Sequence, residues 1–338
     1  MRFSALVKAL VVGGLGVLLF LGVARYVFSA DLGTALNYAL QLPPHTLAVA
    51  LALRALTPLI HAAQFYYAAR SLELPLRFSE AVLGVYSSLA MEYAVPVGGA
   101  TEVYRVYFLA RRGLPLSTSL GTTFLHRLVH SAAAAVELAV VCAYLRTPRY
   151  SEVWLALAVG SVLLLNSLAL AASRSRRVAT SLAKVLGRFT RRVVEVGEVH
   201  LEDVGYLATS AALVALEKVV AGYVGLIITS YFVSSFSFLA SLLLYDLVLA
   251  TFWLLPIVTP AGLGQVEAVQ LAVAVELGMD GTSALPALIL YRATALLAVL
   301  PQLLVALARS GVRIPRKKKH AKAPTSWRYS WERTSPYL

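Results

Sequence analysis

The sequence predicts an all-α integral membrane protein with about six transmembrane helices and two re-entrant hairpins that form an inverted repeat. The first observation behind this is composition: 59% of the 338 residues are hydrophobic and only 14% are charged. Soluble domains carry about 25% charged residues, so a soluble protein is excluded. The second is a set of long apolar runs, and the third is a motif that occurs twice.

Several apolar runs reach the ~20 residues that a helix needs to cross the hydrocarbon core. The first begins after Arg2 and Lys8, and it is expected to stay as an anchor because Phe28 makes a poor signal-peptide cleavage site. Residues 29–45 contain no Lys or Arg and are expected to form a short exposed connection. The six predicted spans are residues 4–28, 46–69, 117–145, 152–172, 204–233 and 283–308.

Two further apolar stretches are interrupted by proline and glycine, which break helices. Each leg is short for a full span, so each pair of legs is predicted to be a re-entrant hairpin. Such backbone survives at membrane depth only where protein or a watery cavity surrounds it. The legs are residues 79–95 with 100–112, around Pro96, Gly98 and Gly99, and residues 236–256 with 261–277, around Pro256, Pro260 and Gly262.

The two breaks belong to a motif that recurs at an offset of 165 residues. Each copy reads Pro-x-Gly and then continues to Glu, Gly and Arg, with 11 positions from Glu to Gly and 14 from Gly to Arg. The copies are Glu102, Gly113 and Arg127, and Glu267, Gly278 and Arg292. Three residue types in step predict a duplicated unit, with repeat cores at about 79–145 and 236–308.

Charge predicts the orientation of the chain in the cell membrane. With both termini inside, 22 of the 30 Lys and Arg residues fall in cytoplasmic segments and three fall outside, as the positive-inside rule expects. The cytoplasmic segments include a basic amphipathic surface helix at about 174–200 and a basic tail at 313–338, after a membrane domain at 1–312. The hairpins then enter from opposite sides, as in the inverted repeats of many secondary transporters.

A few charged side chains fall inside apolar segments, where each costs roughly 2.5–3.5 kcal/mol on insertion scales. Simple pairing, such as Glu102 with Arg105 or Glu217 beside Lys218, explains any single one as well as a function does. Equal spacing in both copies favours a shared role for the repeated Glu and Arg. The set comprises Arg54, Arg105, Arg127, Lys218 and Arg292, with Glu92, Glu102, Glu137, Glu217, Asp246, Glu267 and Glu276 as the acids.

The second leg of each hairpin should begin at mid-depth, where its free N–H groups and the positive end of its dipole favour an anion such as phosphate. The glutamates would complement the dipole, hold the arginines or exchange a proton. The predicted substrate-binding residues are Glu102, Arg105, Arg127, Glu267 and Arg292, and the predicted hinge and anion-site backbone is Pro96, Gly98, Gly99, Pro260, Gly262 and Gly264.

Other chemical signals are weak. His126 and His130 lie one helical turn apart and could share a metal, but helix packing is favoured, so neither a metal nor a cofactor is expected. Phosphate-loop and dinucleotide motifs are absent from the sequence. The basic residues behind the net charge of +13 flank apolar runs, as the positive-inside rule expects. They therefore indicate membrane orientation, and no nucleic acid partner is expected.

The motif residues resemble a known family, the flippase-like membrane domain of lysylphosphatidylglycerol synthetases. Pro96, Gly99, Glu102 and Arg105, with the stretch at 125–128, resemble its first signature. The stretch from Thr259 to Glu267, followed by Tyr291 and Arg292, resembles its second, and the likeness covers roughly 1–312. An acidic residue that often follows the first Arg is replaced by His130. The soluble aminoacyl-transfer domain is missing, so synthetase activity is not expected.

The resemblance implies a lipid translocase that moves a phosphate-bearing lipid, either a phospholipid or a polyprenyl phosphate, between leaflets. Membrane lipids, anionic or phosphate-bearing, are the expected partners, and a homo-oligomer is compatible with the sequence. Two alternatives to this non-enzymatic function stay open. One is an intramembrane enzyme that acts on lipid phosphates with Glu102 or Glu267 as base, and the other is a membrane partner subunit that transports nothing.

Overall fold

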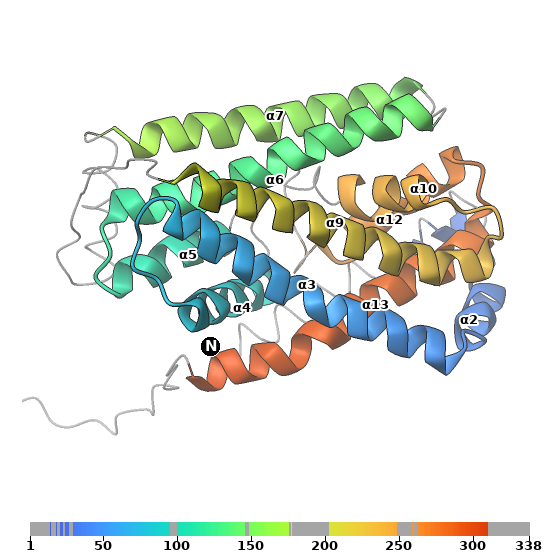
Figure 1. Ribbon diagram of the computed structural model, residues 1–338. Helices are drawn as coiled ribbons and strands as arrows, with labels where there is room; N and C mark the ends of the chain where they lie inside the picture. The colour runs from blue at the N-terminus through green and yellow to red at the C-terminus, as the bar shows by residue number, and fades with distance from the viewer. Residues whose placement is uncertain are drawn as a thin grey trace, which may run out of the picture.

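The structure is a computed structural model that describes residues 30–94, 100–145, 149–175, 203–248 and 262–309, with isolated positions between 14 and 26 and at 177 and 259. The described residues form helices and their connections (Figure 1). The helices are α2 (Leu32–Leu40), α3 (Pro44–Arg70), α4 (Phe78–Ala94), α5 (Ala100–Arg111), α6 (Leu116–Tyr144), α7 (Arg149–Ser173), α9 (Val204–Phe232), α10 (Phe238–Leu242), the π-helical η1 (Leu243–Leu247), α12 (Gln265–Glu276) and α13 (Gly281–Arg309).

Five helices are long and apolar enough to cross a membrane, and they run along the length of one bundle (Figure 1). They confirm five of the six predicted spans and the all-α membrane class. The first predicted span, 4–28, lies outside the described residues apart from isolated positions, and so does most of the predicted surface helix at 174–200. The five are Pro44–Arg70, Leu116–Tyr144, Leu155–Ala172, Val204–Phe232 and Gly281–Ala298.

The connection predicted at 29–45 is largely exposed, and it contains a helix, α2, that was not predicted from the sequence. Asp31 caps α2: its Oδ1 accepts hydrogen bonds from the backbone N–H groups of Gly33 and Thr34, and its Oδ2 accepts one from the Thr34 hydroxyl at 2.8 Å. These bonds, led by that of the Thr34 hydroxyl, hold the pKa of Asp31 below its ordinary value. A capping aspartate is a common start signal, and the short apolar stretch after it concealed the helix.

Two short helix pairs fill the bundle from opposite ends (Figure 1). α4 and α5 form one pair, which starts after the end of α3 and returns to the start of α6. Arg112 after α5 forms an ion pair with Glu80 in the first turn of α4. α10, η1 and α12 lie between the end of α9 and the start of α13. Of the predicted breaks, Pro96, Gly98, Gly99, Pro256 and Pro260 lie outside the described residues, and so does the end of the predicted leg 236–256 from residue 249 on.

The segments that carry the repeated motif have matching lengths and turns. α5 and α12 have 12 residues each, and α6 and α13 have 29 each. Gly113 and Gly278, which follow α5 and α12, both have a φ of 85°. This left-handed conformation suits glycine, and it ends a helix by the same backbone bond in both places. That bond runs from Leu114 N to Leu109 O in the first segment and from Met279 N to Ala274 O in the second.

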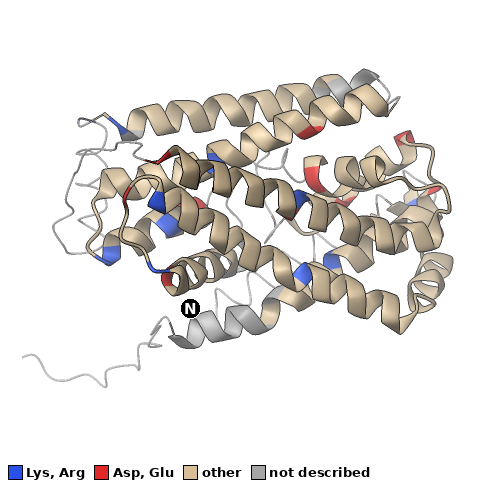
Figure 2. Ribbon diagram, viewed as in Figure 1, with Lys and Arg blue, Asp and Glu red and all other residues tan. Residues whose placement is uncertain are grey.

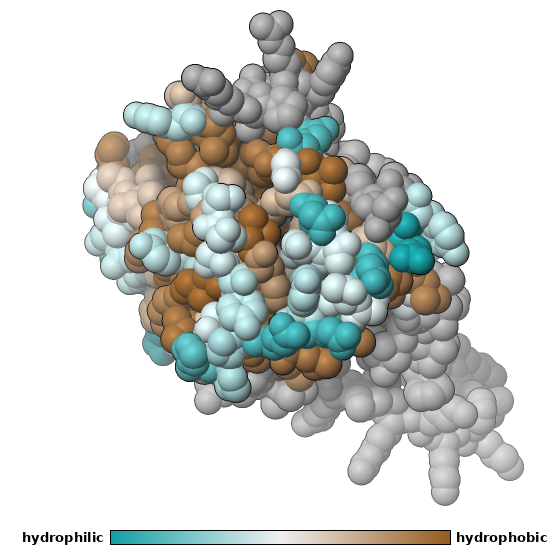
Figure 3. Space-filling view, turned by 90° about the vertical axis from the view of Figure 1, so that its right-hand side faces the viewer, coloured by the Kyte–Doolittle hydropathy of each residue, from teal (hydrophilic) through white to brown (hydrophobic). Residues whose placement is uncertain are grey.

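The two ends of the bundle differ in charge (Figure 2). The end where α3, α5 and α7 finish carries most of the described basic residues outside the helix interiors, namely Arg70, Arg77, Arg111, Arg112, Arg174 and Arg177. The opposite end carries Asp31, Glu276 and Asp280 with Arg25, and the first end also holds Glu73, Glu80 and Asp203, so the charge of the first end is the more positive. Figure 3 looks onto this second end, where hydrophilic residues gather between apolar sides. This difference in charge between the two ends agrees with the uneven distribution of Lys and Arg from which the orientation was predicted.

α9 packs against α10 and η1 through two glycines. A Cβ added to Gly225 would overlap the Tyr245 ring and the Ser241 hydroxyl, and one added to Gly222 would overlap Leu242. The close approach lets the Tyr245 hydroxyl bond to Thr229 on α9 at 2.6 Å. Small residues are the usual means by which membrane helices come this close.

This packing predicts that Gly225→Ala destabilises the protein, by about 1–3 kcal/mol as for other overpacked interiors, because Tyr245 and Ser241 must move. The measurement is thermal unfolding in detergent micelles. Gly160→Ala is the matched control, since nothing lies within 4 Å of a Cβ added to this exposed glycine of α7. The control should be neutral or slightly stabilising, and equal melting shifts for the two variants would contradict the prediction.

Candidate functional site

The repeated glutamates and arginines meet as two ion pairs. Arg127 Nε lies 2.7 Å from Glu102 Oε1, and Arg292 Nε lies 3.0 Å from Glu267 Oε1. Each glutamate is the third residue of its short helix, α5 or α12, and each arginine is the twelfth residue of the long helix that follows. The equal spacing in the sequence therefore corresponds to the same pair in both segments.

Each glutamate also bonds at the start of its own helix. Glu267 Oε2 accepts a hydrogen bond of 2.7 Å from the N–H of Gly264, which precedes α12 with a φ of 83°. Glu102 Oε2 accepts one of 2.9 Å from the Thr101 hydroxyl. Each carboxylate therefore holds the helix start with one oxygen and an arginine with the other. Of the predicted backbone residues, Gly262 also has a positive φ of 69°, whereas Pro96, Gly98, Gly99 and Pro260 lie outside the described residues.

The pairs are buried, which makes them strong constraints. Glu102 is 9% exposed and Glu267 is 4% exposed. A charge taken out of water costs several kcal/mol, and attraction to a partner repays that cost only when the geometry is good. Removing one partner of a buried pair should therefore lower the free energy of unfolding far more than removing one partner of an exposed ion pair.

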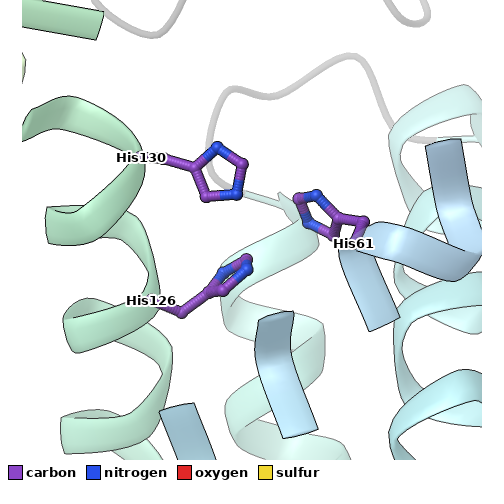
Figure 4. Close-up of side chains that lie close together, drawn as sticks. All are labelled: His61, His126 and His130. Carbon is purple, nitrogen blue, oxygen red and sulfur yellow. The ribbon is translucent and has the colours of Figure 1, made fainter. Parts of the chain in front are cut away.

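Arg105, the third predicted arginine, contacts Ser88 and two of the three histidines drawn in Figure 4. Its Nε donates to Ser88 Oγ at 3.0 Å, and its Nη2 lies 2.9 Å from His61 Nε2. Its Nη1 lies 3.4 Å from His126 Nδ1. A guanidinium can only donate hydrogen bonds, so His61 Nε2 and His126 Nδ1 act as acceptors in these contacts. The pairing of Glu102 with Arg105 that the sequence suggested gives way to the Glu102–Arg127 pair.

Gln64 connects the histidines to an acidic residue on another helix. Its Oε1 lies 2.7 Å from His130 Nε2, and its Nε2 donates to Glu217 Oε2 at 2.7 Å. Glu217, on α9, also lies 3.2 Å from His61 Nδ1. The result is one polar cluster that ties α3, α4, α5, α6 and α9 together. His61 and Gln64 were missed from the sequence, although polar residues three apart in an apolar run are a usable signal.

Among the described residues, the three histidines of this cluster form the group that could hold a metal ion (Figure 4). One ligand atom from each of His61, His126 and His130 lies within 4.8 Å of the others, so α3 adds a third residue to the pair considered from sequence. Zinc–nitrogen bonds are about 2.0–2.1 Å, which needs a closer approach. Two of the three rings direct their lone pairs at the Arg105 guanidinium, itself a cation. The residues therefore fit a buried arginine better than a metal ion.

A second cluster of contacts joins α3, α6, α9, η1 and α13. Arg54 of α3 donates from Nη1 to the Tyr291 hydroxyl at 3.0 Å, and Tyr291 stacks on Tyr245 at 4.0 Å between ring centroids. Lys218 Nζ contacts Glu137 Oε2 at 2.8 Å and also pairs with Asp246, whereas its neighbour Glu217 faces the first cluster. Arg54 and His61 are seven residues apart on α3, so the two clusters lie about 10 Å apart along that helix.

A family model described as the transmembrane region of lysylphosphatidylglycerol synthase matches residues 6–301. The chain belongs to this family. No curated protein matches the chain. Both Glu–Arg pairs and the histidine cluster fall within the matched residues of this synthase-family membrane region.

The buried pairs predict a large stability loss on removing one charge. Glu102→Gln leaves Arg127 without its carboxylate and should destabilise the protein by about 3–5 kcal/mol, and Glu267→Gln should act likewise on Arg292. Thermal unfolding measures both. Glu80→Gln is the matched control, because its ion pair with Arg112 is about 30% exposed and should contribute at most about 1 kcal/mol. The double variants Glu102→Gln/Arg127→Gln and Glu267→Gln/Arg292→Gln should recover part of the loss, and no recovery would argue against a direct pair.

Proposed function

We propose that this protein moves a phosphate-bearing lipid between the leaflets of the cell membrane. One observation carries the proposal: two equivalent Glu–Arg pairs lie inside the bundle, each at the start of a short helix. An arginine can bind phosphate by two parallel charge-assisted hydrogen bonds, as it binds a carboxylate. A lipid phosphate could therefore replace each glutamate on its arginine and be released when the glutamate returns.

The arrangement of helices supports a transporter. In this proposal α4–α5 and α10–α12 are re-entrant hairpins of an inverted repeat, with cores at about 79–145 and 236–308. The matching helix lengths, the equal turns at Gly113 and Gly278, and the entry of the two pairs from opposite ends support it. Transporters of this design place the substrate near the interface of the repeats, where broken helices direct their N-termini at anionic groups.

The alternative of an intramembrane enzyme finds less support. Its base would be Glu102 or Glu267, and each of these carboxylates is bonded to a guanidinium and to the start of its own helix. A base needs a free oxygen to accept a proton, and here one oxygen of each carboxylate faces an arginine and the other faces a donor at the helix start. Exchange of the carboxylate for a phosphate uses the same contacts without a protonation step.

The proposal predicts that Arg127→Lys and Arg292→Lys impair lipid movement by at least tenfold while the fold is kept. Lysine retains the charge and so still neutralises the buried glutamate, but its single ammonium cannot make the two parallel bonds to phosphate. The assay is headgroup sidedness of labelled phospholipids in proteoliposomes, after melting has been checked.

Arg112→Lys serves as the control, because Arg112 lies at the end of the bundle on an exposed ion pair. It should move lipid like the wild type. Wild-type movement and wild-type lipid retention in both Arg127→Lys and Arg292→Lys would make the paired arginines structural and place the lipid site elsewhere.

The orientation is part of the proposal: both termini lie in the cytoplasm. Cysteines introduced singly at 31–37 should then react in intact cells with a reagent that does not cross the membrane, whereas cysteines at 173–175 should react only after permeabilisation. The native Cys142 is first replaced by serine. The reverse pattern of labelling would discard this topology and the inverted repeat built on it.

A further inference from the structure

A buried lysine lies between two carboxyl groups at the centre of the bundle. Lys218 Nζ, on α9, lies 2.8 Å from Glu137 Oε2 on α6 and forms a second ion pair with Asp246 in η1. The side chains of Glu137 and Lys218 are 6% and 12% exposed, while that of Asp246 is 23% exposed. These three residues, called the lysine triad below, belong to neither Glu–Arg pair.

The contacts of the lysine triad are better satisfied if one of its two carboxyl groups carries a proton. The Glu137 and Asp246 carboxyl groups contact the same ammonium and are therefore close neighbours, yet carboxylate oxygens can only accept hydrogen bonds. Glu137 Oε1 is buried and has no hydrogen-bond partner. A proton on one carboxyl group turns the repulsive contact into a hydrogen bond, as in carboxylate pairs that share a proton.

Charged groups on the surrounding helices have partners of their own. On α9, Glu217 faces His61 and Gln64, and on α13 Arg292 pairs with Glu267. On α3, Arg54 donates to the Tyr291 hydroxyl. On α6, His130 lies nearly two turns before Glu137 and bonds to Gln64. Among the described residues, the lysine triad is therefore where two carboxyl groups contact one ammonium group.

We propose that Glu137 and Asp246 share one exchangeable proton, so that the lysine triad is a proton-binding site. Asp246 provides the route of exchange, since its side chain is the most exposed of the three. The π-helical turn of η1 positions it, and such turns are frequent at functional sites.

The position of the triad suggests what the proton does. Glu137 belongs to the first segment, 79–145, and Asp246 to the second, 236–308, while Lys218 lies on α9 between them in the chain. Loss of the proton leaves two carboxylates competing for one ammonium, which changes how the segments are held together. Resting on the proposed function, this makes lipid movement sensitive to a proton gradient.

The proton is tested directly by infrared spectroscopy of the full-length protein in nanodiscs, which detects the C=O stretch of a protonated carboxylic acid. Wild-type protein should show this band at neutral pH, and it should disappear in both Glu137→Gln and Asp246→Asn. Glu80→Gln should keep it. Isotope labelling of glutamate or aspartate in the wild type assigns the band without any substitution, should a variant fail to fold.

A wild-type spectrum without the band, or a band unaffected by both triad variants, would overturn the proton site. The coupling is read in proteoliposomes, where wild-type lipid movement should change several-fold when the pH gradient is reversed and movement by Glu137→Gln should not. Gradient-independent wild-type movement would overturn the coupling alone. No wild-type movement of any phospholipid would overturn the proposed function, and the infrared band would still decide the proton site.

Discussion

The cost of placing charge inside an apolar bundle governs this structure. Each described arginine or lysine within the spans contacts a carboxylate, an imidazole or a phenol on a different helix. Such contacts repay desolvation only at short range, so they fix which helices touch and at which level. The apolar face that leads packing in soluble domains gives little direction here, because lipid is as apolar as the side chains.

α3 shows how far this constraint reaches. Its Arg54 bonds to Tyr291 of α13, and its His61 and Gln64 bond to Arg105 of α5 and Glu217 of α9. α3 therefore meets both segments through polar side chains about two turns apart. α3 thus links polar residues of the first segment to those of the second, although it lies outside both repeat cores.

The sequence predicted what depends on local chemistry and missed what depends on distant contacts. Long apolar runs predicted five spans to within a few residues, and equal spacing predicted that Glu102 and Glu267 are equivalent. The partners were harder: neighbours in the chain suggested Glu102 with Arg105 and Glu217 with Lys218, whereas the structure pairs Glu102 with Arg127 and turns Glu217 toward α3. Glu217 and Lys218 are adjacent and point in different directions. Glu102 and Arg105 share a helix face, but each finds its partner on another helix, so the partner of a buried charge is set by the helix opposite.

The two Glu–Arg pairs and the lysine triad offer different physical properties to a moving bundle. A Glu–Arg pair can exchange its carboxylate for another anion without changing the charge of the site, because a phosphate replaces one anion by another. The lysine triad cannot do this, since its ammonium is shared by two carboxyl groups. Its net charge is neutralised only when a further cation binds to these carboxyl groups. The simplest small cation that two carboxyl groups on one ammonium can share is a proton. An anion-exchanging pair in each segment and a proton shared between segments are separate devices, and their separation on different residues allows substrate binding and coupling to be altered independently.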